Sequence, residues 1–183
     1  MQIHPHFLFN TLNTIYGLAL TKKDSAPGMI LKLADLLDYI LYETKKNKVP
    51  LQREIQHLKD YIALEKLRFG ERLIAEISIA EFSLYIEIPP MLFLPFLENS
   101  FKHGKSSDGI LNLKLKLEII ENQLLFFLKN SVAERKELLD QNSGIGLENI
   151  QKRLKHIYAE AYNLEVSMTE KFYSVSLKIP IKF

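Results

Sequence analysis

The period of the hydrophobic pattern changes at Gly70, and this change constrains the fold more than any other feature of the sequence. Before Gly70, apolar residues recur at steps of three and four, the spacing of one face of an α-helix. After it, apolar residues alternate with other residues, as they do along a half-buried β-strand. We therefore expect two parts, a helical region of residues 1–70 and an α/β region of residues 71–183.

Three helices are predicted in the first part of the chain. They are expected over residues 5–21, 25–44 and 51–69. Ser25 is the expected N-cap of the second helix, with Pro27 in its first turn. Gly70 is expected to end the third helix as its C-terminal cap.

Strands separated by short helices are predicted in the second part. The strands are expected over residues 73–79, 84–88, 110–120, 123–128, 163–169 and 173–179, with helices from Pro89-Pro90 onward and over 147–158. Glu121-Asn122 is typical of a tight hairpin turn between two of these strands. The predicted fold class is α+β, with one mostly antiparallel sheet and helices on one face.

Composition excludes several classes of protein. The chain has 24 Lys and Arg against 22 Asp and Glu, a balance that argues against direct binding of nucleic acid, which usually needs a concentrated basic surplus. It has no cysteine, so disulfides, thiolate metal sites and cysteine nucleophiles are excluded. Its longest apolar runs, 91–97 and 124–128, are far shorter than the roughly 20 residues that cross a bilayer.

A polar stripe follows one side of the first predicted helix. His6, Asn10 and Asn13 stand at i, i+4 and i+7, which places them on one face. The positive end of the helix dipole favours a neutral imidazole, which is nucleophilic, and the free N–H groups would stabilise a phosphoryl group on it. A lone histidine at a helix start more often only caps the helix. Spacing alone does not choose between His6 and His4.

A second polar group stands near residue 100. Asn99, Lys102 and His103 are at i, i+3 and i+4, so they share one side of a helix. An amide oxygen suits Mg²⁺ and a lysine suits phosphate oxygens, which together indicate a nucleotide site. The alternative is an ordinary solvated helix face. Pro95 predicts that this helix starts late or bends there.

Gly144 and Gly146 stand between a polar loop and a predicted helix. Glycines let the backbone approach a phosphate closely, and a helix start presents free N–H groups to it. The pair is neither a P-loop nor a Rossmann fingerprint. Taken alone it is equally compatible with a plain turn.

Together and in this order, the segments resemble the LytS-type sensor histidine kinases, whose catalytic half is a GHKL (Bergerat) ATP-binding domain. QIHPHFLFNTLN at 2–13 resembles the phosphoacceptor box of that family, and YIALEKLRFGERL at 61–73 resembles its linker. IPPMLFLPFLENSFKHG at 88–104 resembles its N box, and GIGLENIQKRL at 144–154 resembles its glycine box. The resemblance covers nearly the whole chain. It implies a helical dimerisation and phosphoacceptor region, 1–70, followed by an α/β sandwich, 71–183.

The resemblance also implies roles for single residues. His6 would be the phosphoacceptor, Asn99 the Mg²⁺ ligand, and Lys102 and His103 the contacts to phosphate. Gly144 and Gly146 would hold the ATP phosphates at the hinge of a mobile lid formed by residues 131–143, and Leu147 would also contact the nucleotide.

Two positions depart from the family pattern. Many GHKL domains carry Asp followed by Gly at the adenine pocket, where this chain has Lys129-Asn130-Ser131. The Asn130 carbonyl can accept a hydrogen bond from the adenine amino group, but a neutral acceptor is weaker than a carboxylate. Many members also place an acid or amide four positions before Asn99, where this chain has Pro95. Glu98 is the candidate catalytic carboxylate here.

The resemblance predicts a kinase that uses ATP and Mg²⁺ to phosphorylate itself on histidine and then passes the phosphoryl group to a response regulator of the LytTR type. A homodimer is expected. Because Met1 stands five residues before His6, the chain is expected to be the cytoplasmic portion of a membrane sensor, anchored through a preceding region. The alternative is a nucleotide-binding or signalling module with little kinase activity, which Asn130 motivates. A purely structural dimerisation protein would leave the glycine box unexplained.

Overall fold

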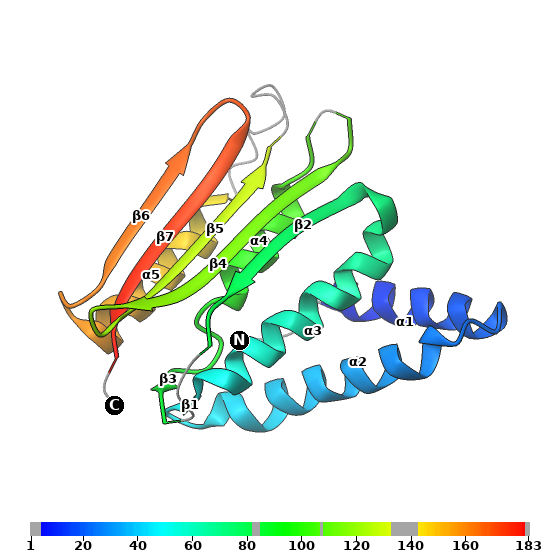
Figure 1. Ribbon diagram of the computed structural model, residues 1–183, viewed down its shortest axis with the longest axis horizontal. Coiled ribbons are helices and arrows are strands. Elements are labelled where there is room, and N and C mark those ends of the chain that lie inside the picture. Colours follow the sequence, from blue (N-terminus) through cyan, green and yellow to red (C-terminus); the bar gives the residue numbers. More distant parts are fainter. Residues whose placement is uncertain (1–4, 82–84, 107, 133–142, 182–183) are drawn as a thin grey trace. The chain divides into compact units, whose positions relative to one another are not determined.

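The computed structural model describes residues 5–81, 85–106, 108–132 and 143–181 of the chain. The chain forms two compact units. The helical unit comprises Met1–Gly70 with Ile88–Met91, and the sheet unit comprises Glu71–Glu87 with Leu92–Phe183. Figure 1 shows the elements of each unit in sequence colours. In the part of the chain that is described, no helix is long and apolar enough to cross a membrane.

The helical unit is built from three helices that follow the predicted pattern. They are α1 (Pro5–Leu20), α2 (Ser25–Tyr42) and α3 (Leu51–Phe69), with a short 3₁₀ helix η1 (Glu43–Lys45) and a short strand β1 (Val49–Pro50) between the last two. Gly70 ends α3 as predicted, with a φ of +58° that favours glycine.

The prediction that Ser25 caps α2 is wrong. Asp24 holds the N-cap position, although its side chain accepts no capping hydrogen bond. The backbone N–H of Ala26 already donates to the carbonyl of Lys23 at 3.1 Å, so the chain turns before Ser25 and includes that residue in the helix.

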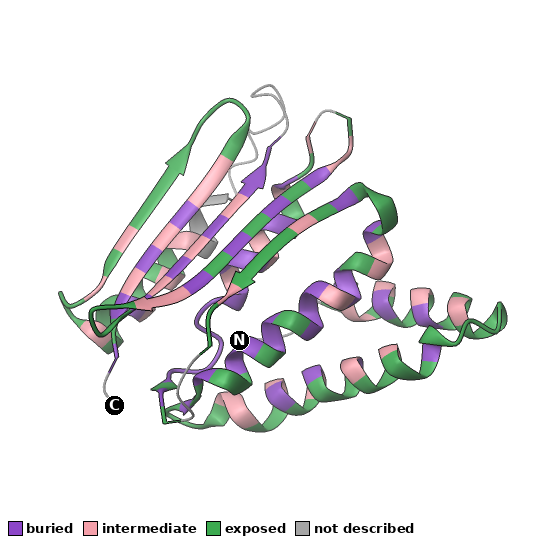
Figure 2. Ribbon diagram, viewed as in Figure 1, coloured by how far each residue is buried: buried purple, intermediate pink, exposed green. Residues whose placement is uncertain are grey.

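The core of the helical unit lies between the apolar faces of its helices. Its buried side chains include Leu33 and Leu36 of α2 and Leu58 and Ile62 of α3. Figure 2 colours the buried positions along these helices purple. Phe7 of α1 stacks on Tyr61 of α3, with ring centroids 4.7 Å apart. Burial of such side chains is the main favourable contribution to folding.

A buried carboxylate ties a later segment to the helical unit. Glu54 of α3 is fully buried and accepts hydrogen bonds from the Tyr39 hydroxyl and from the backbone N–H of Met91, the latter at 2.9 Å. The short strand β3 (Glu87–Ile88), all that is described as strand within the predicted 84–88, pairs with β1. Residues 82–84 lie outside the described residues. Removing Glu54 would leave buried donors without their acceptor.

The sheet unit contains one five-stranded sheet. After the 3₁₀ helix η2 (Gly70–Arg72), its elements are β2 (Leu73–Ile79), α4 (Leu94–His103), β4 (Leu111–Ile120), β5 (Gln123–Ser131), α5 (Ser143–Tyr158), β6 (Asn163–Met168) and β7 (Phe172–Pro180). The strand order is β2-β4-β5-β7-β6. Among the described strands of this sheet, β2 and β4 pair in parallel, and the pairs β4–β5, β5–β7 and β6–β7 are antiparallel.

Both predicted hairpins are present. Glu121 and Asn122, with φ of 50° and 63°, join β4 to β5; two consecutive positive φ values are those of a type I′ turn, which suits the twist of paired strands. Alternate leucines of β4 are buried, and α4 and α5 lie on one face of the sheet (Figure 1). The predicted α+β class, mostly antiparallel with helices on one face, is confirmed.

Two predicted helix starts are wrong. The helix expected from Pro89-Pro90 begins at Leu94, because Met91 has a φ of +55° that interrupts a helical path. Pro95 then lies in the first turn, where its missing N–H has no partner to lose. The helix expected from Leu147 begins four residues earlier, at Ser143.

We expect the stability of the helical unit to depend on His57. This ring is buried and stacks on the Tyr39 ring, with ring centroids 4.2 Å apart. Neither of its nitrogens has a hydrogen-bond partner among the described residues. Burial lowers the pKa of His57 from 6.5 to about 4, although the Asp60 carboxylate acts in the opposite direction. The neutral ring is therefore favoured in the folded state. The contribution of this lowered pKa to the free energy of unfolding is fully present above pH 6.5 and is lost as the pH falls toward 4.

In His57→Phe, which keeps an aromatic ring against Tyr39, this pH dependence should disappear. Between pH 7 and pH 5, the free energy of unfolding of the wild type should fall by roughly 2 kcal/mol more than that of the variant. Urea unfolding at the two pH values measures the difference. Equal losses in the two proteins would show that His57 takes up no proton on unfolding.

Candidate functional site

Helix α4 separates apolar from polar side chains, as its sequence predicts. Leu94, Leu97 and Phe101 are buried. On the other side, Lys102 is exposed and Asn99 and His103 are half-buried. The amide, the ammonium and the imidazole therefore share a partly solvated side of the helix. Lys102 and His103 also lie in the last turn of α4, where a positively charged side chain interacts favourably with the helix dipole.

Glu98 is the acidic side chain beside this group. Burial raises the pKa of its carboxyl to about 7. A carboxyl with this pKa exchanges its proton near neutral pH, as a general acid or base must. Its catalytic role stays a prediction.

Two serines join α4 to the end of β5. The Ser100 hydroxyl donates to Asn130 Oδ1 at 2.8 Å, and the Ser131 hydroxyl donates to the carbonyl of Gly104 at 2.6 Å. Ser100, Asn130 and Ser131 are all buried. Because water cannot replace these bonds, they hold the helix and the strand end in a fixed relation. We name Ser100, Gly104, Asn130 and Ser131 the α4–β5 clasp.

The clasp depends on the small size of Gly104. A Cβ atom at this position would lie 2.2 Å from the carbonyl oxygen of Ser100, 2.5 Å from Leu111 Cδ1 and 2.9 Å from Asn130 Nδ2. All three distances are shorter than real Cβ contacts. Glycine is therefore required here by close packing rather than by its backbone angles, since its φ is an ordinary −86°.

Both ends of the Asn130 amide are hydrogen-bonded within the protein. Its Nδ2 donates to the backbone carbonyl of Ser131 at 2.8 Å, while its Oδ1 accepts from Ser100. The residue is 2% exposed. An amide oxygen has two lone pairs, so Oδ1 retains one acceptor position with respect to the residues that the structure describes. The contact of Asn130 with adenine stays a prediction.

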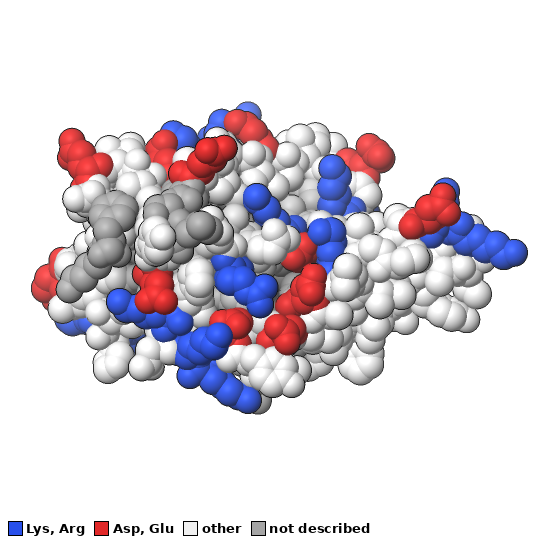
Figure 3. Space-filling view, turned by 60° about the horizontal axis from the view of Figure 1, so that its bottom comes forward, with Lys and Arg blue, Asp and Glu red and all other residues white. Residues whose placement is uncertain are grey.

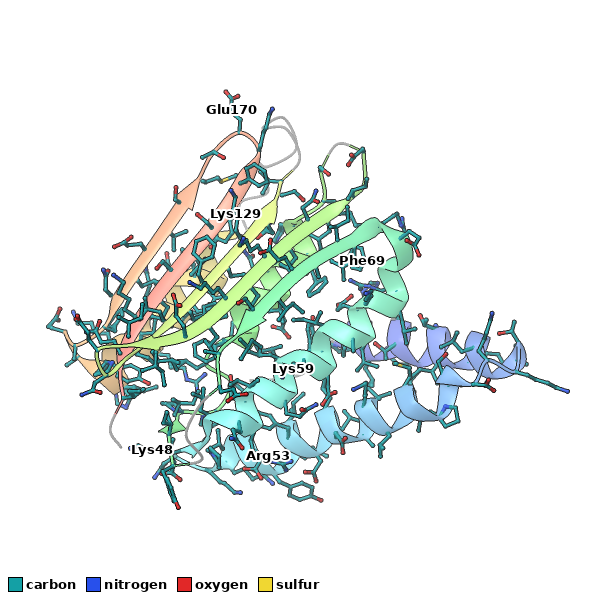
Figure 4. All side chains as sticks on the ribbon, in the orientation of Figure 1. Lys48, Arg53, Lys59, Phe69, Lys129 and Glu170 are labelled. Carbon is teal, nitrogen blue, oxygen red and sulfur yellow. The ribbon has the colours of Figure 1, made fainter. Side chains whose placement is uncertain are left out.

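Lys129 lies on the other side of the sheet. Its Nζ is 4.0 Å from the ring centroid of Phe172 on β7, a cation–π contact, and Figure 4 labels its side chain on β5. Neighbouring residues of a strand point to opposite faces. Lys129 therefore does not belong to the group around α4.

The glycine box differs in part from its prediction. Gly144 and Gly146 were expected before a helix, but the main chain from Ser143 onward is already the first turn of α5. Leu147 is half-buried. The lid predicted over 131–143 falls mostly on residues 133–142, outside the described residues, as do the side chains of residues 143–146. The nucleotide contacts predicted for this box stay predictions.

His6 belongs to the helical unit and is exposed as the second residue of α1. Asn10 Nδ2 lies 3.0 Å from its Nδ1 and 3.3 Å from its Nε2, within hydrogen-bond distance, as the predicted polar stripe requires. The next residue, Phe7, is buried against Tyr61 and fixes this turn of the helix. The imidazole is thus both accessible and oriented. His4 lies outside the described residues.

Comparison with known proteins identifies the family. Residues 1–73 match the family model described as histidine kinase. The sensor protein LytS of Oceanobacillus iheyensis is 31% identical over 99% of this chain, and the sensor histidine kinase BtsS of Escherichia coli K12 is 30% identical over 98% of it. This chain belongs to the LytS-type histidine kinase family. It spans about a third of the length of these relatives, 33% of LytS and 32% of BtsS.

Solved structures share the fold of this LytS-type chain. The histidine kinase AdeS of Acinetobacter baumannii matches with a TM-score of 0.53 and 13% identity, over 92% of this chain and 84% of the AdeS chain in the solved structure. The catalytic domain of the histidine kinase ThkA matches with a TM-score of 0.56 and 14% identity, over 73% of this chain and 95% of that domain's chain. The GHKL fold expected from the sequence is confirmed.

Ser100 and Ser131 are not among the site residues that the sequence patterns predict. Ser100 and Gly104 continue the buried side of α4 from Phe96 at steps of four. A small polar residue and a glycine at that spacing indicate a closely packed neighbour. This signal was available, but the neighbour itself is thirty residues away in the chain, at Asn130.

We expect Gly104→Ala to destabilise the sheet unit. The added methyl group must displace the Ser100 carbonyl, Leu111 and Asn130, which should lower the free energy of unfolding by about 1–3 kcal/mol. Gly17→Ala is the matched control, because a Cβ there meets no atom within 4 Å, and it should be neutral or slightly stabilising. Chemical unfolding measures both. Equal stabilities of the two variants would contradict close packing at Gly104.

Proposed function

We propose that this chain is the catalytic part of a two-component sensor kinase that transfers the γ-phosphoryl group of ATP to His6 and then to an aspartate of a response regulator. The observation that carries the proposal is the α4–β5 clasp. It fixes the buried side of α4 to the end of β5, and this supports a fixed position for the helix that also bears Asn99, Lys102 and His103. Family membership supports the same reaction.

The side chains of this group fit ATP with Mg²⁺. The amide oxygen of Asn99 is a suitable ligand for Mg²⁺, while Lys102 and His103 supply positive charge and N–H donors for phosphate oxygens. Asn99 is half-buried and Lys102 is exposed, so these groups remain accessible. When bound, ATP with Mg²⁺ supplies an activated phosphoryl group with its charge partly neutralised. The protein mainly positions the reacting groups.

His6 receives the phosphoryl group in this proposal. A lone pair of one ring nitrogen forms the N–P bond as the bond from phosphorus to the β–γ bridging oxygen breaks and ADP leaves. In the second step the N–P bond breaks and a carboxylate oxygen of the regulator forms the new bond to phosphorus. Asn10 orients the ring for both steps.

The remaining length of the relatives leaves room for an input region. We propose that the full protein places this region in the membrane and the present chain in the cytoplasm. The regulator is proposed to be of the LytTR type, by family resemblance.

Labelling with γ-³²P ATP tests the kinase reaction. His6→Gln should abolish acid-labile label, because the glutamine amide is not a nucleophile. His156→Gln is the matched control, since His156 is exposed on α5 and has no role in the proposal; it should retain the wild-type rate. Label that persists in His6→Gln at the wild-type rate would refute the assignment.

A nucleotide-binding module with little kinase activity is the second candidate. The observation that favours it is the burial of Asn130, whose amide is already hydrogen-bonded at both ends. Calorimetry with ATP and Mg²⁺, which measures binding, separates the two functions when it is combined with the labelling experiment. Binding without acid-labile label favours the module, and binding with label on His6 favours the kinase.

We further propose that α1 and α2 form a homodimer through their exposed apolar residues. On α1 these are Phe9, Leu12, Tyr16 and Leu20, and on α2 they include Ile30 and Leu41. The α1 residues recur at i, i+3, i+7 and i+11 and therefore form one stripe. Phe9 and Leu20 are 64% and 65% exposed. In Figure 3, Lys, Arg, Asp and Glu are interspersed on the face shown, with broad uncharged surface between them. Such a stripe suits a four-helix bundle with a second copy.

Tyr16→Glu should disrupt this dimer, because it places a charge in the middle of the stripe. Its dimer dissociation constant should rise by roughly a hundredfold or more. Met168→Glu is the control, since Met168 is similarly exposed on β6, and it should dimerise as the wild type does. Sedimentation equilibrium measures both. An unchanged constant in Tyr16→Glu would exclude the α1 stripe as the interface.

A further inference from the structure

The Asn130 amide has one favoured orientation in the α4–β5 clasp. Its Nδ2 faces the backbone carbonyl of Ser131 at 2.8 Å, and a carbonyl can only accept a hydrogen bond. Rotating the amide by 180° would place Oδ1 against that carbonyl oxygen. The resulting repulsion and the lost bond could not be compensated by water, because Asn130 is buried. The carbonyl of Ser131 thus distinguishes the two ends of the amide.

Ser100 holds the other end of the amide. Its hydroxyl is 2.8 Å from Asn130 Oδ1 and 3.2 Å from the carbonyl of Phe96. A hydroxyl has one proton, and the shorter contact is the one to Asn130. Ser100 is fully buried, so its bond to Oδ1 faces no competition from solvent. Among the described residues Oδ1 accepts this one hydrogen bond, so one of its two lone pairs is left.

We propose that Ser100 is a positioning residue that makes Asn130 an acceptor, and not a donor, toward the nucleobase, so that the site selects adenine over guanine. Adenine presents an exocyclic amino group that donates a hydrogen bond, whereas guanine presents a carbonyl oxygen at the corresponding ring position. A free asparagine amide could rotate to serve either base. The clasp prevents that rotation. The inference rests on the proposed binding of ATP.

A single base contact is compatible with the burial of Asn130. One hydrogen bond requires only one accessible acceptor atom, not an exposed side chain. A polar group built to pair with a donor strongly rejects an analogue that lacks the donor, because the buried group is then left unpaired. The clasp therefore gives the neutral amide a selectivity that its weak acceptor strength alone would not provide.

The clasp also explains why aspartate would be unfavourable at this position. A carboxylate has no donor, so in Asn130→Asp an oxygen would replace Nδ2 against the Ser131 carbonyl. The nucleotide-free variant should unfold several degrees below the wild type, although aspartate is the residue that many GHKL domains carry. An unchanged or higher midpoint would overturn the proposed orientation of the amide.

Equilibrium binding of ATP and of GTP, each with Mg²⁺, tests the selectivity. The wild type should bind ATP at least about tenfold more tightly than GTP. In Ser100→Ala the ratio should fall to about threefold or less, mainly through weaker ATP binding, because the amide is then held by one bond only. Ser174→Ala on β7 is the matched control and should keep the wild-type ratio. Asn130→Ser removes the amide and should bring the ratio close to one, which keeps the test valid if Ser100→Ala does not fold.

The outcomes separate this inference from the proposed function. A wild type that binds ATP and GTP equally, or a Ser100→Ala variant that loses affinity for both in the same proportion, overturns the positioning role and leaves the kinase proposal intact. A wild type that binds neither nucleotide overturns the kinase proposal itself and this inference with it.

Discussion

The approach of α4 to β5 at Gly104 is the constraint on which the candidate site depends. At this point the helix comes so close to the strands that a single methyl group would overlap with Leu111 and Asn130. The closeness allows the serine hydroxyls to reach across, and their burial makes each hydrogen bond costly to lose. The polar side of α4 can therefore be rigid although its outer residues are partly solvated. A catalytic surface gains from such support, because positioning is most of what phosphoryl transfer requires from a protein.

Much of the fold could be predicted, because local patterns dominate where the elements are long. The third helix and its glycine cap, and the hairpin at Glu121-Asn122, lie at the predicted residues. The start of α4 could not be predicted in this way. Pro89-Pro90 is typical of a helix start, and the interruption comes from a left-handed Met91, a conformation for which a methionine gives no sequence signal.

The candidate site was predictable only in part, for a related reason. The side of α4 with Asn99, Lys102 and His103 follows from helical spacing alone. The partnership of Ser100 with Asn130 depends on sheet register and on packing between residues thirty positions apart, which no local period encodes. The family resemblance identified Asn130 as important but presented it as a weakened aspartate. In the structure its amide uses a donor that aspartate does not have.

The bond between Glu54 and the backbone of Met91 has a mechanical consequence. Only Leu92 and Phe93 separate Met91 from the first residue of α4, so the helix that carries Asn99 is tethered by two residues to an anchor on α3. A displacement of α3 that moves this anchor would act on the start of α4 through these two residues of main chain. Such a tether would convert tension in α3 into strain at the first turn of α4 without any new contact being made.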